Sequence, residues 1–300
     1  MSGAADRLAT TGQRVTGQPP AGPAADVPPA AGPGSAVTLA FRKAAAENRA
    51  ALVGYLPAGF PTVDGGIDAA VAMAEAGADL VEIGLPYSDP LMDGPVIQAA
   101  VHQALTGGTR IADVLRTVQA VTKTGVPALV MTYWNPVDRY GPAAFARDLA
   151  NAGGSGLITP DLTPEESGPW LEAADSRGLD RVFLVAPSST DERISAVSRV
   201  CRGFLYAASL MGITGTRDAV SERAAGLVSR VRARTSLPVA VGLGVRDGAQ
   251  AAEVAGFADG VIVGSAFVQQ LLKAPDAASG ISAVRDLAAE LARGVRDGRP

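Results

Sequence analysis

The chain has 300 residues, of which 47% are hydrophobic and 5% aromatic, and its formal net charge is −4. This length and apolar content suit one large domain with a substantial core. Because the charge balance is mildly acidic and Lys and Arg do not cluster in a run, the composition gives no electrostatic footprint for nucleic acid or for an anionic membrane surface.

In chain order, the first segment is residues 1–36, which are rich in Ala, Gly and Pro and carry almost no large apolar side chain. Such a segment cannot bury enough surface to offset the entropy lost on ordering. We therefore expect a disordered N-terminal tail, followed by a single folded domain over residues 37–300.

Beyond residue 37, short apolar runs alternate with helix-length segments about eight times. The runs are apolar throughout, as is typical of parallel strands that are covered on both faces. The predicted strands are 51–56, 79–84, 127–132, 156–159, 181–186, 203–208, 238–242 and 259–264. The predicted helices are 63–76, 109–124, 142–152, 164–177, 190–200, 218–234, 247–255, 265–272 and 282–294.

The alternation predicts an α/β protein, namely a TIM (β/α)8 barrel with extra helices. An open doubly wound sheet often carries a glycine-rich nucleotide loop after its first strand. Here the first predicted strand leads into PAGFPT, which has no such pattern. The eight units therefore favour the barrel, whose active site lies at the C-terminal ends of the strands.

Two residue types are scarce: Cys201 is the only cysteine and His102 the only histidine. They leave no intramolecular disulfide, no thiolate or imidazole cluster for a metal, and no Ser-His relay, so we expect no metal site. No stretch reaches the roughly 18 consecutive apolar residues of a membrane helix, and the N-terminus lacks the pattern of a secretory signal. We expect a cytoplasmic protein.

The first candidate for chemistry is Glu82, which interrupts the apolar run DLVEIG. Burial in a strand should raise its pKa toward the range of a general acid or base near neutrality, although an ion pair at the barrel mouth is the alternative interpretation. Asp93 follows in MDGP, where Gly94 and Pro95 turn into a helix. A turn aspartate is a strong competing explanation for Asp93.

Glycine-rich turns close the last three predicted strands: MGITG at 211–215, GLGV at 242–245 and VGSAF at 263–267. Glycine lets backbone N–H groups approach an anion, and a helix that begins at Ser265 would direct its N-terminal partial positive charge to the same place. Together the turns predict a phosphate site, with ordinary turn chemistry as the alternative for each one alone.

The positions of the lysines limit the possible reaction mechanisms. Lys43, Lys123 and Lys273 are the only ones, and none ends a predicted strand, which disfavours a Schiff base. A metal-stabilised enolate is poorly supported, although an all-carboxylate magnesium site stays open. The residues therefore indicate carboxylate acid–base catalysis on a substrate that is anchored by phosphate.

The motifs VEIGLPYSDPLMDGPVIQ, YWNP, PDLTPEES, MGITGTR, GLGV and VGSA occur in this order. In them the chain resembles the tryptophan synthase α subunit family over about residues 38–295. The resemblance implies retro-aldol cleavage of indole-3-glycerol phosphate to indole and glyceraldehyde 3-phosphate, in the last stage of tryptophan biosynthesis. By position, Glu82 matches the acid/base group, and Asp93 matches the aspartate that hydrogen-bonds the indole N–H and stabilises its developing positive charge.

The resemblance also implies substrate contacts. Tyr206 matches a tyrosine that lines the site, and Thr214 belongs to a mobile loop that closes over the substrate. The other residues implied are Tyr55, Met131, Leu184 and Leu243 for the apolar indole pocket, where a wall residue is also a core residue, and Gly215, Gly244, Gly264 and Ser265 for the phosphate.

A partner is implied in the same way. Asp89 and Pro90 match the loop that contacts a tryptophan synthase β subunit, and Asp161 matches an aspartate that contacts this region. The implied assembly is an α2β2 tetramer whose pyridoxal phosphate belongs to the β subunit, with no cofactor in this chain. One departure is Leu210, which follows Ser209 where many members carry an arginine.

Two other functions stay open at this stage. A stand-alone indole-3-glycerol phosphate lyase would keep Glu82 and Asp93 but need no β subunit. A non-catalytic barrel could bind a phosphorylated ligand and regulate a partner, although a pure binder has no need for a carboxylate in an apolar strand.

Overall fold

The computed structural model describes residues 34–208 and 217–299, apart from the side chains of 217–220. Within these ranges eight parallel strands close into a barrel in chain order, and β8 pairs with β1. The strands are β1 (Ala51–Pro57), β2 (Leu80–Gly84), β3 (Ala128–Met131), β4 (Gly156–Thr159), β5 (Asp180–Val185), β6 (Leu205–Ala208), β7 (Val239–Gly242) and β8 (Gly260–Val263). The predicted TIM barrel is confirmed.

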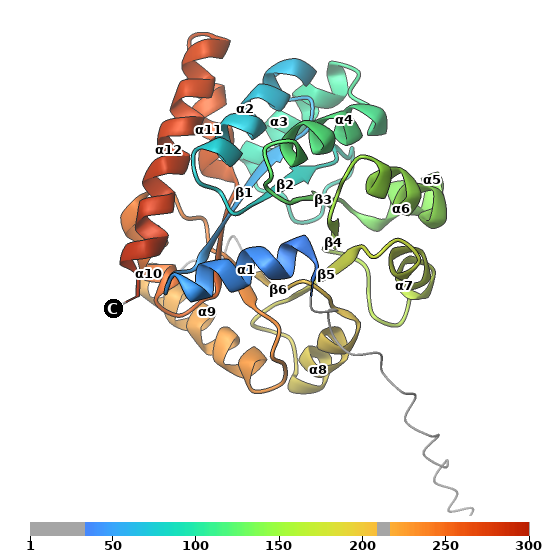
Figure 1. The fold of residues 1–300 in the computed structure, drawn as a ribbon, viewed down its shortest axis with the longest axis vertical. Helices are drawn as coiled ribbons and strands as arrows, with labels where there is room; N and C mark the ends of the chain where they lie inside the picture. Colours follow the sequence, from blue (N-terminus) through green and yellow to red (C-terminus); the bar gives the residue numbers. More distant parts are fainter. Residues whose placement is uncertain (1–33, 209–216, 300) are drawn as a thin grey trace, which may run out of the picture.

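The helices form the outer layer around the strands (Figure 1). They are α1 (Ala36–Ala46), α2 (Val63–Glu75), α3 (Pro95–Thr106), α4 (Ile111–Thr122), α5 (Trp134–Tyr140), α6 (Pro142–Asn151), α7 (Gly168–Asp175), α8 (Asp191–Val200), α9 (Arg217–Arg232), α10 (Gly248–Ala255), α11 (Ser265–Lys273) and α12 (Ala277–Asp297). The helix predicted over 164–177 is shorter in the structure, because residues 163–167 form a turn in which Ser167 Oγ donates to the Pro164 carbonyl.

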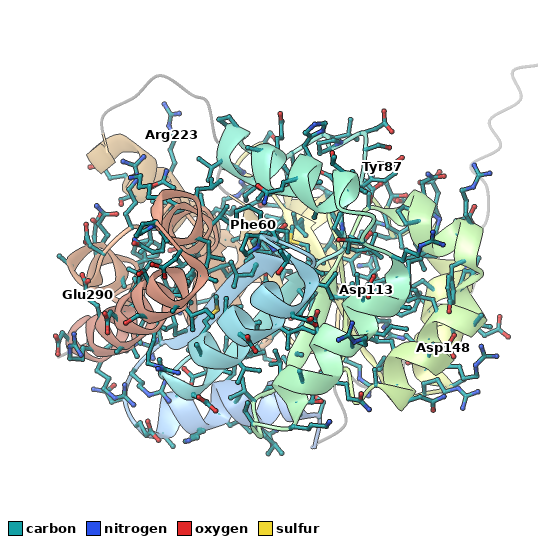
Figure 2. The ribbon with its side chains drawn as sticks, turned by 90° about the horizontal axis from the view of Figure 1, so that it is seen from above. Phe60, Tyr87, Asp113, Asp148, Arg223 and Glu290 are labelled. Atoms are coloured by element: carbon teal, nitrogen blue, oxygen red, sulfur yellow. The ribbon has the colours of Figure 1, made fainter. Side chains whose placement is uncertain are left out.

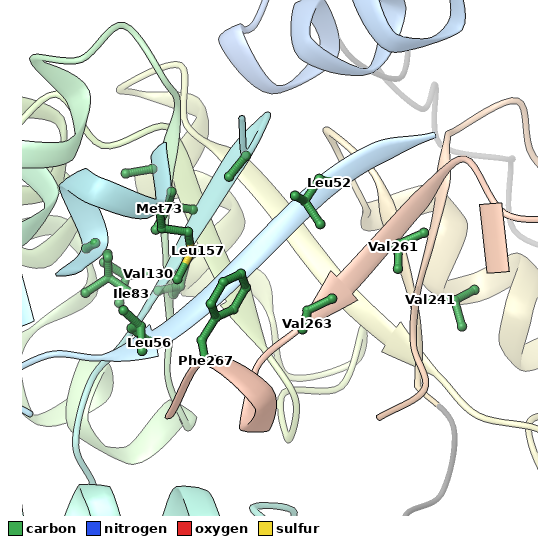
Figure 3. Close-up of a cluster of buried hydrophobic side chains, with 14 of the residues drawn as sticks. Leu52, Leu56, Met73, Ile83, Val130, Leu157, Val241, Val261, Val263 and Phe267 are labelled. Carbon is green, nitrogen blue, oxygen red and sulfur yellow. The ribbon is translucent and has the colours of Figure 1, made fainter. Parts of the chain in front are cut away.

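Alternation along the strands separates two cores. Residues that point outward pack against the helices, as Leu56 and Ile83 do with Met73 of α2 and Phe267 of α11 (Figure 3). Residues that point inward fill the barrel in layers, which is the packing typical of this fold. In Figure 2 the buried Phe60 lies in the interior, whereas the exposed Glu290 lies at the outer rim.

Helix α1 is an element that the sequence analysis does not predict. Ser35 caps it by accepting a hydrogen bond from the Thr38 amide, and Val37, Phe41 and Ala44 form its buried face. These residues pack against the inward-facing side chains at the amino ends of the strands, and the Phe41 and Phe204 ring centroids lie 5.3 Å apart. The helix runs across the barrel and closes this end of it (Figure 1).

Candidate active site

Glu82 points into the barrel from the middle of β2. In the strand register it lies beside Tyr55 of β1 and Leu129 of β3. Its neighbours Val81 and Ile83 point outward into the apolar core under the helices. Because side chains alternate between the two faces of a strand, the carboxylate between them must point inward. The local sequence therefore delivers one acidic group to the interior.

The surroundings of Glu82 favour its neutral form. The residue is fully buried, with 0% exposure, and neither carboxylate oxygen has a hydrogen-bond partner among the described residues. Burial raises the pKa of Glu82 from the ordinary 4.5 to about 8. A carboxyl group in this range can both donate and accept a proton near neutral pH.

Asp93 reaches the same cavity from the loop that connects β2 to α3. The loop ends at Gly94, the N-cap of α3, with Pro95 in the first helical turn. Gln98 Nε2 of α3 donates a 2.7 Å hydrogen bond to the Asp93 carbonyl. Asp93 is partly buried, and burial raises its pKa from the ordinary value.

The two carboxylates line one cavity of about 120 Å³ at the carboxyl ends of the strands. Most of the residues predicted for the site line it too: Tyr55, Met131, Leu184, Tyr206, Gly244, Gly264 and Ser265. The tyrosines, Met131 and Leu184 all lie on the inner face of the barrel, which is why residues from different strands meet here.

Glycines make room for the two tyrosine rings of the cavity. A Cβ atom at Gly84 would lie 2.3 Å from Tyr55 Oη, and one at Gly242 would lie 2.7 Å from Tyr206 Oη. Burial, with smaller effects of the Asp93 and Glu82 charges, holds both phenol pKa values well above the usual 10. Both tyrosines are therefore neutral.

The part of the cavity wall that Gly244, Gly264 and Ser265 form is suited to an anion. Gly244 has a positive φ of 66°, a conformation that favours glycine. Gly264 is the N-cap of α11, Ser265 is its first residue, and no side chain caps this helix end. Uncapped backbone N–H groups at a helix N-terminus are a common binding site for phosphate.

The structure does not bring every predicted residue to the cavity. Leu243 is partly buried and packs against the outer core, because it has the opposite strand parity from Gly242. Thr214 and Gly215 lie outside the described residues, as do Ser209 and Leu210. The cavity also contains residues that the sequence analysis did not select, namely Met92, Gly94, Ile97, Ala208, Gly242 and Ile262. Of these, Ile262 could have been found from its strand parity.

The residues predicted to contact a partner lie at the same end of the barrel. Asp89 is exposed and Pro90 is partly buried. Asp161 accepts hydrogen bonds of 2.9 and 3.1 Å from the Trp134 amide at the start of α5. Within residues 34–208 and 217–299 no group of three or more His, Cys, Asp or Glu could hold a metal ion, and none of the helices there is long and apolar enough to cross a membrane.

The closed barrel, with a cavity at the carboxyl ends of its strands, defines a TIM-barrel protein, and comparison with known proteins agrees with this fold. The sequence model of the family described as tryptophan synthase alpha chain matches residues 41–296. The tryptophan synthase alpha chain of Salinispora arenicola is 62% identical over 262 residues, or 87% of this chain and 98% of the relative. That of Streptomyces coelicolor is 63% identical over 260 residues, or 86% and 95%.

Solved structures give the same result. A chain of ligand-free tryptophan synthase from M. tuberculosis superposes with a TM-score of 0.81 at 52% identity, over 88% of this chain and all of that one. The alpha subunit from Legionella pneumophila gives 0.80 at 31% identity, over 87% and 98%. The chain belongs to the tryptophan synthase alpha chain family. The alpha reaction is the function of this family, and the chain is an enzyme subunit of the lyase class.

Proposed function

We propose that the chain cleaves the carbon–carbon bond of indole-3-glycerol phosphate by acid–base catalysis with its own carboxylates, releasing indole and glyceraldehyde 3-phosphate. The observation that carries the proposal is the state of Glu82: a fully buried carboxyl without a hydrogen-bond partner among the described residues, with a pKa of about 8, facing a cavity. A purely structural glutamate would be expected to have an ion-pair partner at this depth.

Glu82 acts first as the acid. Its proton goes to C3 of the indole ring, the glycerol hydroxyl next to the ring gives up its proton, and the bond between C3 and the glycerol carbon breaks. The electrons of that bond return to the ring, and the carbon that carried the hydroxyl becomes the aldehyde. Glu82 takes up the hydroxyl proton and is again neutral, as its raised pKa favours.

Asp93 stabilises the charge that this protonation creates. When C3 is protonated, positive charge develops at the indole nitrogen, and a carboxylate that accepts the N–H hydrogen bond lowers the energy of that state. Asp93 lines the same cavity as Glu82. Tyr55, Met131, Leu184 and Tyr206 form the wall against which an apolar indole ring would pack.

The phosphate binds to the backbone of Gly244 and Gly264 and to Ser265 at the N-terminus of α11, which all line the cavity. Thr214 and Gly215, which the family resemblance also assigns to the substrate, belong to the same proposal. Binding at the phosphate fixes the ring relative to Glu82, so that remote binding energy contributes to orienting the reacting bond.

The partner of this proposal is a tryptophan synthase β subunit in an α2β2 tetramer, with the pyridoxal phosphate in that subunit. The loop after β2 supports such a contact because it displays Asp89 and Pro90 beside Leu91 and Met92, whose side chains are 79% and 46% exposed. Large exposed apolar side chains at the mouth of an active site are typical of a protein interface.

The test is indole release from indole-3-glycerol phosphate by the purified chain, with and without a tryptophan synthase β subunit. Slow release that rises sharply with the partner is the expected result. Fast release that ignores the partner would identify a stand-alone lyase. The absence of release in both conditions would contradict the catalytic proposal and favour a barrel that only binds its ligand.

A further inference from the structure

The hydroxyl group of Tyr133 holds the loop that carries Asp93. Tyr133 follows β3 by two residues and its side chain is buried, with 6% exposure. Its Oη atom accepts hydrogen bonds from the Leu91 amide at 3.0 Å and from the Met92 amide at 2.9 Å. Asp93 is the next residue in the chain, so the contact lies directly before a proposed catalytic group.

These bonds are a large part of what fixes the loop. The side chain of Leu91 is 79% exposed and adds little packing to hold the backbone, whereas that of Met92 is 46% exposed and lines the active-site cavity. A further hydrogen bond that joins this segment to the rest of the barrel runs from Gln98 Nε2 to the Asp93 carbonyl. The backbone of this segment is therefore held on one side by α3 and on the other by the phenol.

Tyr133 itself is rigidly placed. It extends directly from β3, and the next amide, that of Trp134, donates to both carboxylate oxygens of Asp161. Its ring packs against that of Tyr87, with centroids 5.4 Å apart. Tyr133 is thus anchored by a barrel strand, a neighbouring loop and an aromatic contact. A side chain anchored in this way can hold a loop segment that it contacts in one position.

Asp93 and Tyr133 are also close to each other. They line one small cavity of about 20 Å³ next to the active site. Burial raises the pKa of Tyr133, the Asp93 charge raises it further, and the amides of Met92, Leu91 and Asp93 lower it. The balance leaves a neutral phenol whose oxygen is turned toward the loop backbone.

We propose that Tyr133 is a positioning residue for the alpha reaction, because its phenol oxygen fixes the backbone of Leu91 and Met92 and so sets the place of Asp93 in the cavity that Glu82 also lines. The inference rests on the function proposed above and adds the element that aligns one of its two carboxylates. Displacement of a reacting or stabilising group by about 1 Å can cost on the order of 10²-fold in rate.

The test is the kinetics of Tyr133→Phe, Asp93→Asn and the double variant, measured as indole release with the β subunit present. The Phe variant keeps the ring and removes only the acceptor. We expect its kcat to fall by roughly 10- to 100-fold, with KM for the substrate changed much less. Because Tyr133 acts through Asp93, the double variant should be no slower than Asp93→Asn alone, within about twofold.

Tyr140→Phe is the matched control. Tyr140 is exposed on α5, and its hydroxyl contacts Asp148, away from the cavity. Its variant should keep wild-type kinetics. If Tyr133→Phe also keeps wild-type kcat, or if the two single losses multiply in the double variant, the positioning role is wrong. If the wild type itself releases no indole, the proposed function fails first.

Hydrogen exchange of the wild-type chain gives a second readout that depends on neither folding of a variant nor turnover. The Leu91 and Met92 amides should exchange more slowly than the amide of the exposed Asp89 in the same loop, because only the first two donate to the phenol. Equal exchange at the three positions would show that the phenol does not hold the loop and would overturn the inference.

Discussion

Glu82 and Tyr55 are register partners on adjacent strands, and both side chains enter the barrel interior at the level of the cavity. Both side chains are buried, and no hydrogen bond joins them, because the carboxylate oxygens of Glu82 have no hydrogen-bond partner among the described residues. The Glu82 charge raises the pKa of the phenol, after the larger effect of burial. The carboxyl thus lies in an apolar setting with a raised pKa, as acid–base catalysis requires.

Replacement of Glu82 by Gln should remove the proton donor and leave the shape of the cavity. We expect kcat for indole release to fall by roughly 10²- to 10⁴-fold, the usual contribution of a general acid or base. Affinity for a non-reactive substrate analogue, measured by calorimetry, should stay within about threefold of wild type, since one neutral side chain replaces another. Glu172→Gln, at an exposed position on α7, is the control. Loss of binding in step with turnover would indicate a binding role for Glu82 instead.

The pH dependence of kcat/KM should follow the same group. Glu82 must be protonated to donate to the indole ring, so kcat/KM should fall as the pH rises through about 8. Initial rates between pH 6 and 10 test this. A rate that instead increases through pH 8 would mean that the ionised form is required first, and that the order of proton transfers is reversed.

Glu82 should also make the fold less stable as the pH rises. Between pH 4.5 and about 8 the unfolded chain has lost this proton while the folded chain keeps it, so the free energy of unfolding falls across this window. At about 1.4 kcal/mol per pKa unit, the shift sets an upper limit of about 5 kcal/mol for this cost. Glu82→Gln should therefore be more stable than wild type at pH 8 and lose that advantage toward pH 4.5. Urea denaturation at both pH values is the measurement, and an advantage that does not change with pH would have another cause.

Gly84→Ala should disturb the site through Tyr55. The new Cβ would lie 2.3 Å from Tyr55 Oη, so the ring must move, at a cost of roughly 1–3 kcal/mol in stability and with a lower kcat. Gly226→Ala is the matched control: this glycine is exposed in α9 with nothing within 4 Å of the added atom. There the change should be neutral or stabilising by up to about 1 kcal/mol. Melting curves and rates of indole release for both variants test this prediction. Wild-type stability and kcat in Gly84→Ala would show that Tyr55 tolerates displacement.

Sequence patterns predict the barrel well because buried parallel strands appear in the sequence as short apolar runs. The position of Glu82 follows from the same pattern, since an acidic residue inside an apolar run is expected to point into a functional cavity and not into the apolar core. Helix α1 is harder to predict, because its Ala-rich sequence adjoins the Ala-rich segment before it, and its apolar face, Val37 and Phe41, is short.

Details of the site depend on three-dimensional geometry, which is harder to predict from the sequence pattern. Leu243 is assigned to the pocket by position in the motif GLGV, but strand parity turns it to the outer core and places Gly242 inside. The role inferred for Tyr133 cannot be predicted from residue types, because its hydroxyl meets backbone amides and any residues could supply these.

Closure of one barrel end by α1 has a consequence for how small molecules enter and leave the active-site cavity. Among the described residues, the packing of Phe41 on Phe204 fills the interior at the amino ends of the strands, whereas the cavity that Glu82 lines lies at their carboxyl ends. The substrate and both products of the proposed reaction would pass through this end of the barrel, where the loop that carries Asp93 borders the cavity. A protein that docks on that loop would stand at the exit, where it could receive one product before bulk solvent does.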